Sequence, residues 1–411
     1  YQPGPVGNNR DKANPNAAMG QHDWLEFGRR RGITCISSED WFGDAAAPQW
    51  SFYASRLRSA ADFGGVGFGA LVIPRVSGQR EWGMAQKLLA LVGRGSKTIK
   101  FFTFGPEYNF PGNCWSENPS VFAARAKGMK LVARGEDLLY PGRWRTPEVA
   151  ILAPQSAQLW DLEGPDVATG LLDVTNNGMF RRHMAYMSET YGLFLALAHR
   201  AVPVRFVDEI ALESHAELEG VKVLYVTAPD LPESGMEGLL KWVQQGGTLV
   251  LTAGSGVSDR YHQPSDTLLS AAGVVLESAP ARPLLASLRS LEPSGLGRGN
   301  EAATLKGDGP GETLSLITDE VSVLARFADG RPAVTARPLG LGRILRFACF
   351  PGLSYSRSAE WPKNDLPHGF DAGWRRQICR PVEEAGVELP VLLDRDLIEA
   401  PDDSSMEEVA A

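Results

Sequence analysis

Acidic and aromatic side chains come together at two places in the first third of the chain. The first is the run ITCISSEDWFGD, in which Glu39 and Asp40 stand beside Trp41 after a short apolar stretch. Carboxylates can act as acids, bases or nucleophiles, and an indole offers a flat apolar face on which a sugar ring can stack. The same acids are also common as helix caps and in ordinary loops, so both interpretations stay open.

The second place is the run IKFFTFGPEYNFPGNCWSEN, a Gly- and Pro-rich stretch that carries Glu107, Asn109, Trp115 and Glu117. Amide, carboxylate and indole groups together suit the recognition of hydroxyl groups, and long loops after strands often carry binding residues. Between the two places, Arg75 follows another apolar run and can bind an anionic group or pair with an acid. A plain surface loop is the alternative interpretation of the second run.

Short apolar runs alternate with amphipathic stretches up to about residue 145, which is the pattern of strand–helix units on a parallel sheet. We predict strands at 33–36, 70–73 and 98–104, and helices at 50–63, 84–92 and 121–139. Three or four such units cannot close a (β/α) barrel. We therefore expect either half of a barrel, completed by another segment, or an open doubly wound sheet.

A second α/β pattern of flavodoxin-like type occupies residues 146–275. We predict its strands at 149–152, 202–206, 221–226 and 248–252, and helices at 184–200 and 239–245. After it the chain changes to short strands at 321–327, 333–337 and 343–347, typical of an antiparallel meander. We divide the chain into residues 1–145, 146–275 and 276–411, where the last part completes the second domain or forms a third.

Three segments of the second region carry a resemblance to a known family. They read VAILAPQSAQLWD, YGLFLALAHRAVPVRFVDE and VKVLYVTAPDLPESGMEGLLKWVQQGGTLVLTAGSGVSDRY. Over residues 147–262 the chain resembles the trimerisation domain of glycoside hydrolase family 42 β-galactosidases, and the regions on either side fit that family's domain order. The resemblance implies the carboxyl-terminal half of a (β/α)8 TIM barrel, then a flavodoxin-like domain, then a small antiparallel or α+β region. It also implies a homotrimer and a β-linked carbohydrate substrate.

Domains of this type are related to class I glutamine amidotransferases, which carry a nucleophilic Cys at the turn after a central strand. In this chain the comparable turn reads VTAPDLPE, and no Cys occurs between residues 115 and 348. Because amidotransferase chemistry needs an activated thiolate, the residue types exclude it for this domain.

Glycoside hydrolysis needs two carboxyl groups on either side of the scissile bond. The resemblance implies an acid/base Glu after the fourth barrel strand, which we expect outside this chain, and a nucleophilic Glu at the end of the seventh. The run LVIPRVSG has Pro74 and Arg75 at that seventh-strand position. The candidate catalytic acids are Glu39, Asp40 and Glu107, and the candidate substrate-binding residues are Trp41, Arg75, Asn109, Trp115 and Glu117. A non-catalytic carbohydrate-binding or assembly subunit is the alternative.

The overall composition excludes several classes of binding partner. The net charge of −8 comes without a basic block, which disfavours nucleic acid, and no apolar run approaches the ~20 residues of a membrane span. The six His form no metal-binding pair, so we expect no metal and no cofactor. We expect the four Cys to be buried thiols. The opening residues resemble a loop entered from an upstream segment, and nothing in the sequence favours one compartment.

Overall fold

The structure is a computed structural model of the 411-residue chain. It describes residues 23–40, 47–73, 81–101, 119–157, 185–278, 289–293, 305–307, 311–360 and 367–391. None of the helices in these segments is both long and apolar enough to pass through a membrane.

The first part of the chain forms a parallel sheet with the strand order β1-β2-β3. Its strands are β1 (Cys35–Asp40), β2 (Gly67–Val72) and β3 (Thr98–Phe101). Its helices are α1 (Trp24–Arg29), α2 (Ala47–Gly64), α3 (Glu81–Val92), α4 (Pro119–Arg134) and α5 (Glu136–Leu139). Strands and helices alternate along the chain, which confirms the predicted strand–helix units.

Among the described helices, those that contact this small sheet pack against one of its faces. Ile36, Phe68, Ala70 and Val72 are buried in the core on the face that α2 and α3 cover. On the opposite face, Ser37, Thr98 and Lys100 are exposed. A doubly wound sheet is covered by helices on both faces, whereas a barrel has its helices outside only. The one-sided packing is that of a barrel segment.

The strand that carries the first candidate acids differs from the prediction. It begins at Cys35 and continues to Asp40, two residues later and four residues further than the apolar run ITCI indicated. Pairing with β2 extends the strand through Ser37, Ser38 and Glu39. Of these, Ser37 and Glu39 lie on the open face, which needs no apolar side chains. Glu39 and Asp40 therefore lie within the strand and not in a loop after it.

The second part is built on a nine-stranded sheet with the order β12-β11-β14-β15-β16-β8-β6-β4-β5. Strands β5, β4, β6, β8 and β16 run parallel, and β16, β15, β14, β11 and β12 pair antiparallel. The bounds are β4 (Val149–Leu152), β5 (Val204–Val207), β6 (Val223–Val226), β8 (Thr248–Leu251), β11 (Arg289–Pro293), β12 (Leu305–Gly307), β14 (Ser322–Phe327), β15 (Pro332–Leu339) and β16 (Gly342–Phe347). The predicted meander is confirmed, and it continues the parallel sheet.

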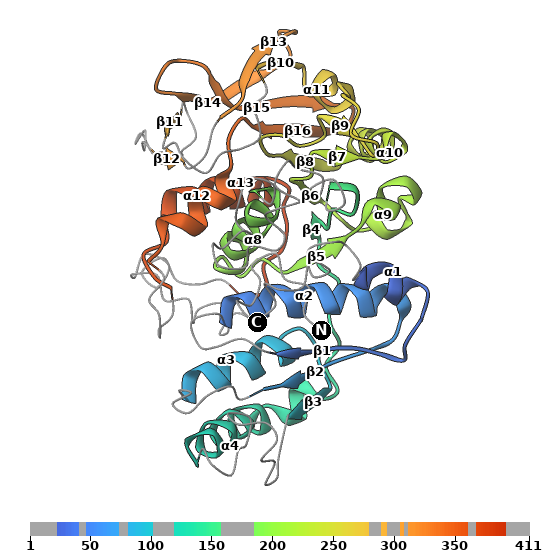
Figure 1. Ribbon diagram of the computed structural model, residues 1–411, viewed down its shortest axis with the longest axis vertical. Helices are drawn as coiled ribbons and strands as arrows, with labels where there is room; N and C mark the ends of the chain where they lie inside the picture. The colour runs from blue at the N-terminus through green and yellow to red at the C-terminus, as the bar shows by residue number, and fades with distance from the viewer. Residues whose placement is uncertain are drawn as a thin grey trace, which may run out of the picture.

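Two groups of helices flank the parallel strands (Figure 1). One consists of α8 (Ala185–Ala198), α12 (Pro351–Ser358) and α13 (Ala372–Glu384), and the other of α9 (Glu209–Ser214), α10 (Glu233–Gln244) and α11 (Thr267–Ala271). A 3-10 turn lies at Ala216–Leu218. Two small sheets pair β7 (Asp230–Leu231) with β9 (Ser258–Asp259) and β10 (Val274–Ser278) with β13 (Thr313–Leu316).

Helix α2 lies between the two sheets (Figure 1). It contacts β1 and β2 on one side and β5 and α8 on the other. The ring of Phe52 meets the rings of Tyr191, Phe194 and Phe206 edge to face, with centroids 5.5, 5.3 and 5.2 Å away. The Phe206 amide N–H, on the edge strand β5, donates to Ser59 Oγ at 2.9 Å. The helix thus joins the two parts and covers a sheet edge.

An arginine from α1 adds a charged contact to this junction. Arg29 donates two hydrogen bonds to Asp208, both at 2.8 Å, and two to Glu217, both at 2.7 Å. Asp208 is fully buried and also caps α9 by accepting from the Ala211 N–H at 3.1 Å. Bidentate pairs of this kind fix geometry as well as charge. The orientation of α1 on the second part is set by this arginine.

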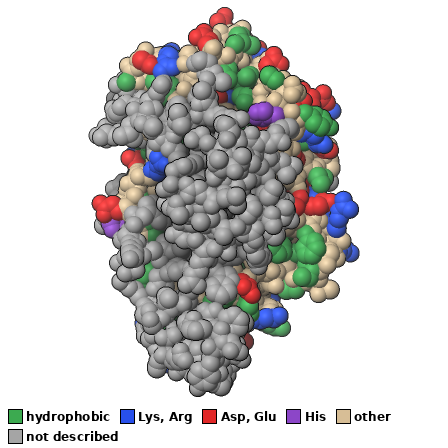
Figure 2. All heavy atoms as spheres, viewed as in Figure 1, with side chains coloured by type: hydrophobic (Ala, Val, Ile, Leu, Met, Phe, Trp, Pro, Cys, Tyr) green, Lys and Arg blue, Asp and Glu red, His purple; other side chains and the backbone are tan. Residues whose placement is uncertain are grey.

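The surface shows no concentration of one charge over the described residues that face the viewer. Figure 2 shows acidic and basic side chains interspersed along the right-hand edge of the molecule. The structure contains exposed ion pairs, for example Arg260 with Glu213 at 3.1 Å.

Replacing Phe52 with Ala should destabilise the protein, because it removes the ring that fills the space between three aromatic neighbours. We expect a loss of about 3–5 kcal/mol in the free energy of unfolding, measured by urea denaturation. Tyr140→Ala is the matched control, since Tyr140 is 70% exposed and Phe52 only 1%. Equal midpoints for the two variants would show that α2 does not hold the parts together.

Candidate functional site

The carboxyl ends of β1, β2 and β3 meet at one edge of the first sheet. Glu39 pairs in register with Leu71, which pairs with Lys100, and Asp40 pairs with Val72, which pairs with Phe101. The last two positions of β1 are therefore at the edge where parallel barrels carry their active sites.

Glu39 lies on the open face of this sheet. Successive residues of a strand alternate between its faces, and Ile36, three positions before Glu39, is fully buried on the helix side. Glu39 is half-buried and shares its row with Lys100, which is exposed two strands away. Adjacent strands are about 4.8 Å apart, so the two backbones are roughly 10 Å apart. A carboxylate and an ammonium group thus share the face that would line a barrel interior.

The structure does not describe the side chains of the other predicted site residues. Trp41, Arg75, Glu107, Asn109, Trp115 and Glu117 lie outside the described residues, and Asp40 is described as a strand position only. Trp41 comes directly after β1 and Arg75 comes two residues after Ile73, so the chain leaves the described region at this same edge. The structure brings Glu39 alone to a defined position on the edge.

Lys87 contacts the end of β2 at this edge and is not among the residues predicted from the sequence. It lies on α3, is fully buried, and its Nζ donates to the carbonyl oxygen of Ile73 at 3.3 Å, just beyond β2. The carbonyl of Lys87 in turn accepts from Trp50 Nε1 at 3.3 Å. One feature of the sequence could have identified Lys87. In the run MAQKLLALV it is a charged residue on the apolar side of the helix. Its hydrogen bond positions Ile73, the residue that follows β2.

The carboxyl ends of the second sheet are also rich in acids, but backbone amides hold these acids. Glu209 accepts from the N–H groups of Gln155 and Ser156 at 2.9 and 2.7 Å and from Ser156 Oγ at 2.6 Å. Burial raises the pKa of Glu209, and these hydrogen bonds lower it in part. The arrangement fixes the turn after β4 against the start of α9.

Glu189 makes a similar contact in the middle of the second part. It is fully buried on α8 and accepts from the N–H groups of Gly352 and Leu353 at 3.0 and 2.6 Å, at the start of α12. The helices cross so closely that a Cβ on Gly192 would lie 1.9 Å from the Gly352 oxygen. Burial raises the pKa of Glu189 to about 8, although the two amides favour its charged form.

The turn after β6 carries no cysteine. Thr227, buried there, shares a 2.7 Å hydrogen bond with Thr190 of α8. Burial raises the pKa of the Cys349 thiol well above its usual value and that of Cys379 to about 12, so both stay protonated at neutral pH. Both are buried as predicted, Cys35 is half-buried, and Cys114 lies outside the described residues. The described residues contain no cluster of three metal-ligating side chains.

The fold is similar to that of several solved β-galactosidases. A catalytic mutant of a GH42 β-galactosidase from G. stearothermophilus is 17% identical with a TM-score of 0.63, over 90% of this chain and 52% of that one. A β-galactosidase from Bacillus circulans sp. alkalophilus is 17% identical with a TM-score of 0.64, over 92% and 54%. One from Rahnella sp. R3 is 15% identical with a TM-score of 0.64, over 90% and 53%.

The chain has a GH42-like fold. It spans about half the length of these enzymes, and its α/β architecture with parallel sheets is that of part of a TIM-barrel glycosidase. No known family model matches the sequence. No curated protein matches it either. The likeness is therefore one of fold, and it agrees with the resemblance read from the motifs of the second region.

The raised pKa of Glu189 predicts a pH dependence of stability. Since the folded pKa of about 8 lies above the usual 4.5, the protonated carboxyl is favoured in the folded state. The stabilisation is complete below about pH 4.5 and is lost as the pH rises towards 8. The unfolding free energy of the wild type minus that of Glu189→Gln should fall between pH 5 and 8, by up to about 1.4 kcal/mol per pH unit.

Urea denaturation at pH 5, 6, 7 and 8 measures this difference. Glu237→Gln on the exposed side of α10 is the control, and its difference from the wild type should not change with pH. A difference for Glu189→Gln that is constant or rises with pH would contradict the assignment.

Proposed function

We propose that this chain is an internal or processed part of a glycoside hydrolase that acts on a β-linked carbohydrate in the manner of β-galactosidases. One observation carries the proposal. Glu39 lies at the carboxyl end of a strand, on the open face of a one-sided parallel sheet. In a fold like that of the GH42 β-galactosidases, this edge belongs to the barrel mouth.

In the proposed mechanism two carboxyl groups act on either side of the glycosidic bond. One protonates the leaving oxygen, and the other attacks the anomeric carbon or activates water, with a separation of about 5 Å for retention and more for inversion. Glu39, Asp40 and Glu107 are the acids that we propose from this chain, and a further acid/base Glu comes from the segment that completes the barrel. Substrate recognition is assigned to Trp41, Arg75, Asn109, Trp115 and Glu117.

The described part of the first sheet supports the need for such a segment. Among the described strands, β1 and β3 each pair on one side only, with β2. Unpaired strand edges promote aggregation, because their free backbone groups can pair with another chain. Closure of a sheet into a barrel removes these edges. Leu138 and Tyr140, 81% and 70% exposed, add apolar surface just after α4. We propose that an upstream segment, or a second chain, supplies the remaining strands.

We propose that the second part is a flavodoxin-like trimerisation domain. In order of appearance its strands β4, β5, β6, β8 and β16 lie as 2-1-3-4-5, the order of doubly wound flavodoxin-like sheets. Because β16 belongs to this sheet, we count residues 276–411 with the second domain. A wall beside the barrel mouth and subunit contacts are the roles that we propose for it.

A non-catalytic carbohydrate-binding or assembly subunit is the rival function. Pro74 and Arg75 favour it, because they stand where the seventh-strand Glu is expected and neither can attack an anomeric carbon.

Activity on aryl β-glycosides separates the two functions. The full-length protein should hydrolyse 4-nitrophenyl β-galactoside or a related β-glycoside, and Glu39→Gln or Glu107→Gln should lower kcat by roughly 100-fold or more, because the amide can neither donate a proton nor act as a nucleophile. Release of nitrophenolate is the measurement, and Glu237→Gln is the matched control. Unchanged turnover in both site variants would remove these assignments, and no turnover on any glycoside would favour the binding subunit.

Light scattering tests the proposed assembly. At micromolar concentration we expect a mass three times that of one chain. The mass of a single chain would refute the trimer, and the proposal of hydrolysis would stand independently.

A further inference from the structure

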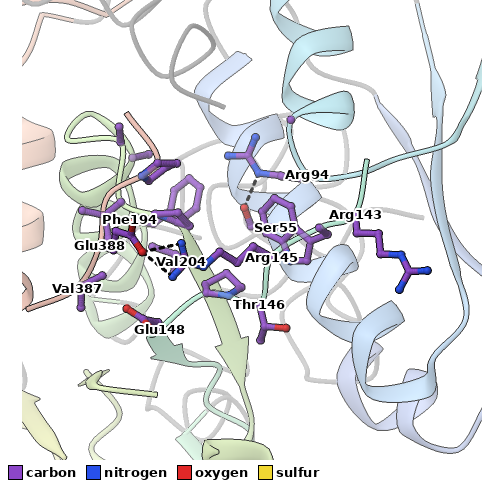
Figure 3. Close-up of a pocket in the computed structure, with 18 residues that line it drawn as sticks. Ser55, Arg94, Arg143, Arg145, Thr146, Glu148, Phe194, Val204, Val387 and Glu388 are labelled. Atoms are coloured by element: carbon purple, nitrogen blue, oxygen red, sulfur yellow. Dashed lines mark hydrogen bonds and ion pairs between the residues drawn. The ribbon is translucent and has the colours of Figure 1, made fainter. Parts of the chain in front are cut away.

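A cavity of about 240 Å³ lies at the junction of the two α/β parts. Its walls include Ser55 of α2, Arg94 before β3, Arg145 before β4, and Phe194 and Val204 of α8 and β5 (Figure 3). The segments that precede β3, β4 and β5 lie at the amino ends of these strands. The cavity is therefore separate from the candidate active site, which lies at carboxyl ends.

Apolar side chains make up much of the wall. Phe194, Ala198, Val202 and Val204 are all buried and belong to the main hydrophobic core. Ligand sites are typically apolar concavities with a few polar groups, and they occur often where domains meet. The apolar wall suits a flat apolar group that fits beside the Phe194 ring.

A positive charge is built into one side of the cavity. Arg94 is 6% exposed, and it donates through Nε to Ser55 Oγ at 2.6 Å and through Nη1 to the Ala90 carbonyl at 2.9 Å. Its guanidinium carbon also lies 6.0 Å from the centroid of the Phe194 ring. These contacts hold the guanidinium in place. A fixed, poorly solvated cation attracts an anion more strongly than one in water does.

A second guanidinium is held by a weak partner. Both terminal nitrogens of Arg145 donate to one oxygen of Glu388 at 3.0 Å, and the two side chains are mostly exposed. Exposed ion pairs of this kind contribute little to the free energy of folding, so a ligand carboxylate can replace Glu388 as the partner of Arg145. Figure 3 shows this pair beside Phe194 and Val204, while the Arg143 side chain points away from them.

The balance of charge around the cavity is positive. Three arginines and two glutamates line it, and one of these glutamates, Glu148, already forms an ion pair with Lys222 at 3.1 Å. An anionic ligand therefore gains from its surroundings, and a cationic one does not.

We propose that this junction cavity binds a small molecule that has a flat apolar body and one carboxylate, such as an aromatic carboxylate. The body lies against Phe194 and Val204, and the carboxylate lies between Arg94 and Arg145. The inference does not depend on glycoside hydrolysis, because no residue of the candidate active site takes part.

Benzoate is the probe, with benzyl alcohol as its neutral counterpart at the same ionic strength. Ligand-observed NMR titration should give a Kd on the order of 1 mM for benzoate and a value at least about 5-fold weaker for benzyl alcohol. Ala198→Leu places a larger side chain in the cavity wall and should weaken benzoate at least 10-fold, whereas the exposed Ala133→Leu on α4 should leave it unchanged.

Arg145→Gln tests the carboxylate contact, and Arg134→Gln, on the exposed end of α4 outside the cavity wall, is its matched control. The first should weaken benzoate about 3-fold or more without affecting benzyl alcohol, and the second should change neither. Absence of benzoate binding at 20-fold the expected Kd, or binding that survives Ala198→Leu, overturns the site. Equal affinity for benzoate and benzyl alcohol overturns the carboxylate part of the proposal.

Discussion

The structure depends on helix α2, which is buried against a sheet on each side. A helix at the surface of one domain has one apolar face, but α2 buries Trp50 and Phe52 as well as Leu57 and Ala60. Its Ser59 hydroxyl accepts a backbone N–H of the edge strand β5, so the second sheet ends at this helix. Separating the two parts would expose all of these groups to water. The barrel segment and the nine-stranded sheet are therefore held in one arrangement, and the carboxyl edge of β1–β3 is fixed relative to both.

A second constraint is the face of the first sheet that no described helix covers. Its helix side buries Ile36, Phe68, Ala70 and Val72, and its other side carries Ser37, Glu39 and Lys100 around Gly69 and Leu71. Polar side chains on the face of a parallel sheet are unusual, because such sheets are generally buried on both faces. A barrel interior near the mouth is a place where they are expected, since catalytic side chains project there from strand ends. The polar residues on this face therefore support two proposals: that further strands complete a barrel, and that the candidate site lies at its mouth.

The acids of the two parts differ in what holds them. Glu189, Glu209 and Glu312 accept backbone N–H groups at turns or helix starts of the second part, and Glu312 also forms a fully buried pair with Arg346. Removing one such partner leaves a buried polar group unsatisfied, which destabilises the fold. These acids are structural, and one of them, Glu209, also follows the carboxyl end of a parallel strand. Position at a strand end alone does not identify a catalytic acid; an open face is also needed.

The sequence by itself determined the elements whose patterns are local. The strand at Val149–Leu152 has its predicted bounds, and the helix at Ala47–Gly64 extends the predicted one by a few residues, because side-chain periodicity is set by neighbours a few positions away. The tertiary structure decided that β16 joins β8 in parallel, that β1 runs on to Asp40, and that Glu39 lies on the open face. Lys87 and the cavity at Arg94 and Arg145 also became visible only there. These features depend on pairing and packing between residues far apart in the chain. A local sequence pattern does not specify which distant residues will be in contact.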